Sequence, residues 1–215
     1  MKREDLKRFG ITLLFWLLFV IWTLLIRYVD VAAVGPEGSA VGFATMNLAF
    51  HRMTGVHMTL YTITDWLGLM PFTVASGFGA FGLVQWIARK SLRQVDFTIF
   101  VLGGCYIATI AIYILFEYVV INYRPVLING YLEASYPSST TMLTMSVMPT
   151  AVLQLRGRIK RRALKWCTTV VLTAFTAFMV IGRLLSGVHW LSDIIGGILL
   201  SAGLVTMYYA VSKLK

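Results

Sequence analysis

The sequence predicts an all-α integral membrane protein: one domain over residues 1–215, built as a bundle of six transmembrane helices. Composition indicates this class, because 58% of the 215 residues are hydrophobic and only 13% are charged. A soluble domain carries about twice that charged fraction. Several apolar runs also reach the roughly 20 residues that a helix needs to cross the hydrocarbon core of a bilayer.

The six expected spans are separated by short polar connections. They cover about 9–26, 67–88, 97–121, 138–155, 166–185 and 189–211. A turn at Gly35-Pro36 follows the first span. The next moderately apolar stretch, 41–60, is expected to form a helix at the membrane interface. The first span has no small-residue cleavage site, so we expect it to stay as a membrane anchor.

The basic residues orient these spans. Of the 19 Lys and Arg residues, 15 lie in the amino terminus, the second-to-third connection, the fourth-to-fifth connection and the carboxyl terminus. Positive residues favour the cytoplasmic side, so both termini are expected in the cytoplasm. The opposite, outer side holds Arg27, Arg52, Arg124 and Arg183. The net charge of +10 is therefore a topology signal, and no nucleic acid partner is expected.

One outer stretch, 182–193, brings Arg183, His189 and Asp193 together at the membrane edge. Ionisable groups at this depth are costly, which makes them functional candidates. If the chain is helical from His189 onward, His189 and Asp193 lie one turn apart on one face. The carboxylate could then accept the imidazole Nδ1–H and leave Nε2 bare as a nucleophile or base.

Two further outer segments carry polar residues. The first contains Arg124; the second, 136–141, has a proline followed by Ser138, Ser139 and Thr140, which is typical of a helix start. Backbone amides at a helix amino terminus bind anions, and arginine binds phosphate oxygens. A phosphate ester is therefore the favoured ligand. The alternative is that these residues merely line loop ends.

These motifs resemble those of the type 2 phosphatidic acid phosphatase superfamily, which includes membrane lipid phosphatases. The third family motif matches at Arg183, Gly187, Val188, His189, Ser192, Asp193 and Gly196, while Gly182 replaces its serine. The first motif is half present as Arg124-Pro125, because Glu117 occupies the lysine position. In the second motif, Thr140 occupies the position of a histidine. The resemblance extends over roughly the whole chain.

The resemblance implies hydrolysis through a phosphohistidine without a metal ion. His189 would attack phosphorus and Asp193 would hold its ring. Arg124, Arg183 and the segment 138–140 would bind the charged oxygens. No cofactor or metal is expected. Cys105 and Cys167 lie in apolar runs without the paired spacing of a disulfide or zinc site, so both are expected in the core.

The missing histidine is the family's general acid, and Thr140 cannot supply a proton at neutral pH. A diphosphate needs that proton less, because phosphate is already a good leaving group. We therefore expect an outer-leaflet polyprenyl diphosphate, such as undecaprenyl diphosphate, rather than phosphatidic acid or phosphatidylglycerophosphate. Glu117 is a possible proton donor, although pairing with Arg124 or Arg183 is the favoured alternative. His51 and His57 are expected at the surface.

Two other functions remain open from the sequence. A non-hydrolytic protein could use the same phosphate-binding residues to bind or transport an anionic lipid, which would explain the missing lysine and histidine. A lipid phosphotransferase could pass the phosphoryl group from His189 to another acceptor. Expected partners are the lipid phosphate substrate and membrane lipids, and the sequence gives no oligomeric state.

Overall fold

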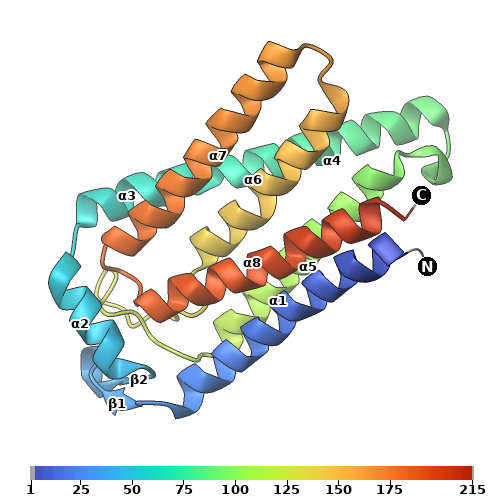
Figure 1. The fold of residues 1–215 in the computed structure, drawn as a ribbon. Coiled ribbons are helices and arrows are strands. Elements are labelled where there is room, and N and C mark those ends of the chain that lie inside the picture. The colour runs from blue at the N-terminus through green and yellow to red at the C-terminus, as the bar shows by residue number, and fades with distance from the viewer. Residues whose placement is uncertain (1–2, 215) are drawn as a thin grey trace.

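The computed structural model describes residues 3–214, most of which form a bundle of long helices (Figure 1). The elements in chain order are α1 Arg3–Tyr28, β1 Ala32–Ala33, a 3₁₀ helix Pro36–Gly38, β2 Ala40–Val41, α2 Ala44–Thr54, α3 Met58–Leu67, α4 Leu69–Arg89, a 3₁₀ helix Leu92–Gln94, α5 Phe97–Tyr118, α6 Ser139–Arg158, α7 Arg162–Leu185 and α8 Leu191–Ser212. The two strands pair antiparallel and are two residues long each.

Six long helical segments correspond to the six expected spans. Five of them are long and apolar enough to cross a membrane: α1, the continuous path of α3 and α4, α5, α7 and α8. The sixth, α6, is less apolar, yet nine of its residues are buried. Its polar side chains face protein rather than lipid, which a membrane bundle tolerates. The predicted all-α membrane bundle is confirmed.

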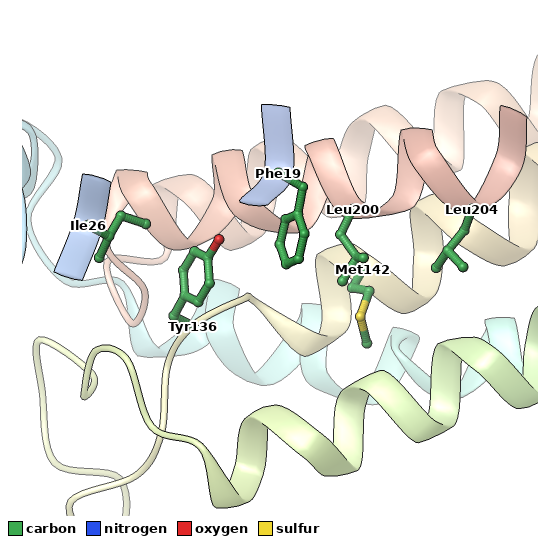
Figure 2. Packing of buried hydrophobic residues seen from close by; sticks show 6 residues of the cluster. All are labelled: Phe19, Ile26, Tyr136, Met142, Leu200 and Leu204. Carbon is green, nitrogen blue, oxygen red and sulfur yellow. The ribbon is translucent and has the colours of Figure 1, made fainter. Parts of the chain in front are cut away.

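The core lies where α1 and α8 run side by side (Figure 1). Figure 2 shows its buried side chains: Phe19, Ile26, Tyr136, Met142, Leu200 and Leu204. The Tyr136 hydroxyl also hydrogen-bonds to Thr23 Oγ1 at 2.6 Å. A Cβ on Gly196 would lie 2.3 Å from Tyr136 Cε2, so only glycine lets the ring pack this closely on α8. These contacts fix the segment that leads into α6.

The segment between the first two spans differs from the expectation. Instead of one interfacial helix over 41–60, the chain forms α2 and α3, which residues 55–57 separate. At about 1.5 Å per residue, the 32-residue path from Met58 to Arg89 is about 48 Å long. That length exceeds the roughly 30 Å of the hydrocarbon core, so α3 extends toward the headgroup level.

Two smaller expectations were wrong. The last helix begins at Leu191, two residues later than His189. Asp193, at its third position, accepts the Trp190 N–H at 3.0 Å, as in a capping box. Cys167 is exposed rather than buried, while Cys105 is partly buried.

The two ends of the bundle carry different segments. Figure 1 shows both termini at the end away from α2, β1 and β2, together with the α4–α5 connection. The opposite end holds the loop 119–138, the start of α6 and the α7–α8 turn. The three polar segments expected on the outer side therefore lie at one end, which we call the site end.

Candidate functional site

The loop 119–138 is the first component of the site, and it is fixed by backbone contacts. Tyr123 and Ala134 form an antiparallel bridge, and the Arg124 N–H donates to the Glu133 carbonyl at 3.0 Å. Trp190 Nε1 donates to the Tyr123 carbonyl at 2.7 Å. The loop is thereby held against the turn that precedes α8.

His189 lies at the centre of the site and is 3% exposed. Its Nδ1 lies 3.0 Å from Ser135 Oγ, and that hydroxyl donates to Asp193 Oδ2 at 2.5 Å. Since the hydroxyl proton points to the carboxylate, Ser135 Oγ accepts the proton on Nδ1. Nε2 is then bare, and it has no hydrogen-bond partner among residues 3–214. Ser135 thus links His189 to Asp193, in place of the direct contact expected between them.

Asp193 is held by a buried polar network rather than by the imidazole alone. Besides Ser135 and the Trp190 N–H, its carboxylate accepts Asn122 Nδ2 at 3.0 Å and Ser192 Oγ at 3.4 Å. These donors compensate the cost of burying a carboxylate. The network makes the position of Ser135, and through it the His189 ring, rigid.

The two arginines expected to bind phosphate are both buried, with exposed fractions of 8% for Arg124 and 1% for Arg183. Arg124 Nε forms an ion pair with Glu133 Oε2 at 3.1 Å. Arg183 Nη2 donates to Asp65 Oδ1 at 2.9 Å and to Thr140 Oγ1 at 2.7 Å. Arg124 Nη1 and Arg183 Nε lack hydrogen-bond partners in the described part of the chain, so each guanidinium keeps a free donor.

Burial and charge together set the protonation of His189. Desolvation lowers its pKa well below the ordinary value, and the positive charges of Arg124 and Arg183 lower the pKa further. A lowered pKa keeps the ring neutral at physiological pH, which is the nucleophilic form.

The start of α6 supplies further donors. Ser138 is completely buried, its N–H donates to the Asp193 carbonyl at 3.1 Å, and its Oγ has no partner among the described residues. The first backbone N–H groups of a helix have no acceptor within the helix, so those of Ser139 and Thr140 remain for an anion. The Thr140 hydroxyl itself is bonded to Arg183.

Two adjoining cavities lie at this centre. The smaller one is lined by His189, Ser135, Ser139 and Glu117. The larger one lies between α4, α5 and α6, and its lining includes Leu69, Phe72, Ile110, Ser139, Thr140 and Leu143. Ser139 lines both cavities, which places the larger, mostly apolar cavity directly beside the His189 centre.

The other sequence candidates fall in different places. Glu117 lines the smaller cavity with His189 and lies close enough to interact with the Tyr113 hydroxyl. The favoured pairing of Glu117 with an arginine is not found among the described residues, because Arg124 and Arg183 pair with Glu133 and Asp65. 

The remaining histidines have structural contacts. His51 Nε2 lies 3.1 Å from the Gly187 carbonyl, and His57 Nε2 lies 2.8 Å from the Thr54 carbonyl. Among residues 3–214, no three His, Cys, Asp or Glu side chains lie together so that they could hold a metal ion.

Sequence reasoning missed four residues of the site: Ser135, Asn122, Glu133 and Asp65. Their partners lie 9 to 118 positions away along the chain, so no local periodicity reveals the contacts. For Asp65, one signal was available: it is an acidic residue inside an apolar stretch, where a charge indicates a partner or a function.

Comparisons with known proteins agree with this geometry. The model of the PAP2 superfamily matches residues 104–215. A crystal structure of a transmembrane PAP2-type phosphatidylglycerolphosphate phosphatase from Bacillus subtilis has the same fold, with a TM-score of 0.64 at 16% identity over 95% of this chain and 98% of that chain. A search among curated proteins finds no match. Because the family model covers just over half of the chain, including all three motif segments, the protein belongs to the PAP2 superfamily.

Proposed function

We propose that this protein is a membrane lipid phosphatase that works without a metal ion, through a phosphohistidine on His189. The observation that carries the proposal is the state of the His189 ring. Nδ1 is bonded to Ser135, whereas the buried Nε2 has no hydrogen-bond partner in residues 3–214. A buried nitrogen without a partner costs stability, and a phosphoryl group would complete its bonding.

In the first step, His189 Nε2 attacks phosphorus and the bond from phosphorus to the leaving oxygen breaks. Negative charge on the phosphoryl oxygens is stabilised by the free donors of Arg124 and Arg183 and by the start of α6. Asp193 acts through Ser135, which keeps the proton on Nδ1 and orients the ring. The imidazole becomes positively charged as the bond forms, and the carboxylate stabilises that charge.

The substrate that fits this site best is a diphosphate lipid of the polyprenyl type. Thr140 replaces the family's general acid, and its oxygen accepts from Arg183 Nη2. An aliphatic hydroxyl is too weak an acid to protonate a departing lipid alcohol at neutral pH. A departing phosphate needs no such help, whereas general acid catalysis is typically worth about 10²- to 10⁴-fold for a poor leaving group. The apolar cavity lined by Leu69, Phe72 and Ile110 would hold the chain.

The proposed orientation places both termini in the cytoplasm and the site at the outer leaflet. It follows from the Lys and Arg residues, which concentrate at the end of the bundle that carries the termini and the connections 89–93 and 156–165. A diphosphate lipid exposed on the outer leaflet would then enter sideways from the bilayer.

The experiment is phosphate release by the purified protein in detergent, without added metal, from a polyprenyl diphosphate and from phosphatidic acid. We expect release from the diphosphate to be faster by tenfold or more, and His189→Ala to abolish it. Thermal unfolding of the variant checks that the fold is kept.

Three other outcomes would change the conclusion. Full activity of His189→Ala would exclude His189 as the nucleophile. Binding of both lipids without release would instead support a protein that binds or transports anionic lipids. Loss of lipid phosphate without free phosphate, with the group transferred to an added alcohol, would indicate a phosphotransferase.

A further inference from the structure

Helix α3 lies against Gly182, one of the positions where this chain departs from the family pattern. Gly182 replaces the family's serine, and a Cβ at this position would lie 2.7 Å from Thr64 Cγ2. Non-bonded carbon atoms prefer about 3.5–4.0 Å, so a serine would push α3 away. Glycine at 182 therefore allows α3 to lie against the end of α7.

This close approach brings a carboxylate to the position of the missing histidine. Asp65 Oδ1 accepts from Arg183 Nη2 at 2.9 Å, and the same nitrogen donates to Thr140 Oγ1 at 2.7 Å. Asp65 Oδ1 and Thr140 Oγ1 therefore both lie within hydrogen-bonding distance of one nitrogen atom, Arg183 Nη2. Gly68 is close as well, since its Cβ would lie 3.5 Å from Thr140 Cγ2. In this chain Asp65 therefore stands beside the position of the missing histidine.

We infer that Asp65 is a further catalytic residue: the general base that activates water for hydrolysis of the phosphohistidine. The inference rests on the proposed function, because it requires a phosphoryl group on His189. In the family pattern, one histidine acts as the acid in the first step. The second step is hydrolysis of the phosphohistidine, and it needs a base. With a diphosphate substrate the acid is dispensable, and the base alone is needed.

The second step balances with Asp65 as the proton acceptor. Its carboxylate takes a proton from water while the water oxygen attacks phosphorus. The bond from phosphorus to His189 Nε2 breaks, and its electron pair returns to the imidazole, which becomes neutral. Inorganic phosphate leaves, and Asp65 then gives its proton to solvent.

The surroundings of Asp65 leave part of its carboxylate accessible. Asp65 Oδ1 pairs with Arg183 Nη2 at 2.9 Å. The side chain is 55% exposed and lines the larger cavity with Ser139, which also lines the His189 cavity. The cavity beside Asp65 and the cavity beside His189 therefore adjoin at Ser139.

Two other carboxylates lie at the site end near the arginines and the histidine, and they are the natural competitors. Glu133 forms an ion pair with Arg124 at 3.1 Å. It has no hydrogen bond with Thr140 among the described residues. Glu117 lines the His189 cavity but occupies the position of the family's phosphate-binding lysine, not that of the histidine. Asp65 alone of the three shares a donor nitrogen with Thr140.

The test separates the two half-reactions. Full-length wild type, Asp65→Asn, Glu117→Gln and Glu133→Gln are mixed with a polyprenyl diphosphate labelled in its terminal phosphate, and both protein-bound label and free phosphate are followed. Asp65→Asn keeps an oxygen that can accept from Arg183 but cannot take a proton. We expect its phosphate release to fall by about 10²- to 10⁴-fold while labelled protein accumulates. Glu133→Gln is the matched control and should not accumulate label.

The outcomes are distinguishable. If Asp65→Asn slows labelling itself and no label accumulates, Asp65 only holds Arg183 and the inference is wrong. Accumulation in Glu117→Gln instead would assign the base to Glu117. Asp65→Glu, which restores a carboxylate, should recover part of the release; no recovery with an unchanged unfolding temperature would also count against a base. Undiminished release by His189→Ala would overturn the proposed function itself.

Discussion

The two ends of the bundle both contain an aspartate with arginines, yet they differ in how completely these groups are bonded. At the end that carries the termini, Asp96 accepts from Gln85 at 2.9 Å, Arg89 at 3.0 Å and Arg158 at 3.2 Å. Gln154 continues the cluster, with hydrogen bonds to Arg158, the Thr98 carbonyl and Tyr208. None of these side chains is among the buried unpartnered groups of residues 3–214.

At the site end, Arg124, Arg183 and His189 keep buried nitrogen atoms without hydrogen-bond partners among residues 3–214. Buried hydroxyl groups without partners occur there as well, on Ser39, Ser138 and Thr141, and farther along α6 on Thr144 and Ser146. Each such group costs about 1–3 kcal/mol, so their concentration at one place weakens the fold unless a ligand completes them. The bonded cluster joins α4, α5, α6 and α8 and stabilises the bundle. Both ends contain charged side chains, so polarity alone does not show which end binds a ligand. The unpartnered nitrogens of Arg124, Arg183 and His189 indicate that the ligand binds at the site end.

The largest expected effect comes from the same substitution at both ends. Asp193→Asn should lower the rate of phosphate release by about 10³-fold or more, because an amide can donate to Ser135 and no longer enforces the proton on His189 Nδ1. Asp96→Asn removes a carboxylate from the bonded cluster and should leave turnover within about twofold. Phosphate release from a polyprenyl diphosphate measures both.

Thermal unfolding of the two variants gives the control for this pair. Asp193→Asn must stay folded for its loss of activity to be a catalytic effect. Equal loss of turnover in both variants would remove the distinction between a catalytic end and a structural end.

A smaller difference is expected for the arginines. Arg124→Lys keeps the charge but removes the planar fork whose Nη1 is free, so kcat/KM should fall by about 10- to 100-fold. Arg158→Lys, at the other end, should lower the unfolding temperature by a few degrees through loss of the Asp96 and Gln154 contacts, with little change in kcat/KM. The contrary result, a larger kinetic effect from Arg158→Lys, would mean that the termini end takes part in turnover.

Much of the fold followed from the sequence, because a transmembrane helix is encoded locally. Five of the six spans are apolar runs long enough to be recognised one by one. The sixth, α6, is the least apolar, and its prediction rested on the helix-start pattern around Ser138 together with the apolar residues that follow it. The break between α2 and α3 at residues 55–57 was missed, since both flanking stretches have similar composition.

The site was predictable only as far as its motifs. The third motif placed Arg183, His189 and Asp193 in one short stretch, and the structure brings Arg124 to the same end. The i, i+4 spacing also suggested direct contact between His189 and Asp193, which failed because the helix starts two residues after His189. Ser135 and Asp65 reach the site from 54 and 118 positions away from their partners, and such contacts depend on how the helices pack.

The smallest expected effect is a pH dependence of stability that also separates the two ends. Burial lowers the pKa of His189, so below the ordinary value of about 6.5 the unfolded chain binds a proton that the folded chain refuses. The contribution of His189 to stability should then fall as pH decreases below about 6.5, by at most about 1.4 kcal/mol per pH unit for one proton. At the other end, the hydrogen bond from Gln85 lowers the pKa of Asp96. The stability that Asp96 contributes is fully present above the ordinary aspartate pKa of about 3.9. It is lost as the pH falls through the lowered pKa of Asp96 in the folded protein.

Unfolding temperatures between pH 7 and 4.5 test this contrast. His189→Gln should flatten the decline seen in the wild type, because it removes the proton-binding group from the unfolded chain, whereas Asp96→Asn should leave the decline unchanged. A decline that survives in His189→Gln would show that another group at the bundle causes it. Since a bare, neutral Nε2 is the form that attacks phosphorus, the acid limb of kcat/KM should likewise lie below pH 6.5 in the wild type. The lowered pKa of His189 thus has two expected effects. It lowers stability at acid pH, and it keeps Nε2 neutral and the enzyme active at that pH.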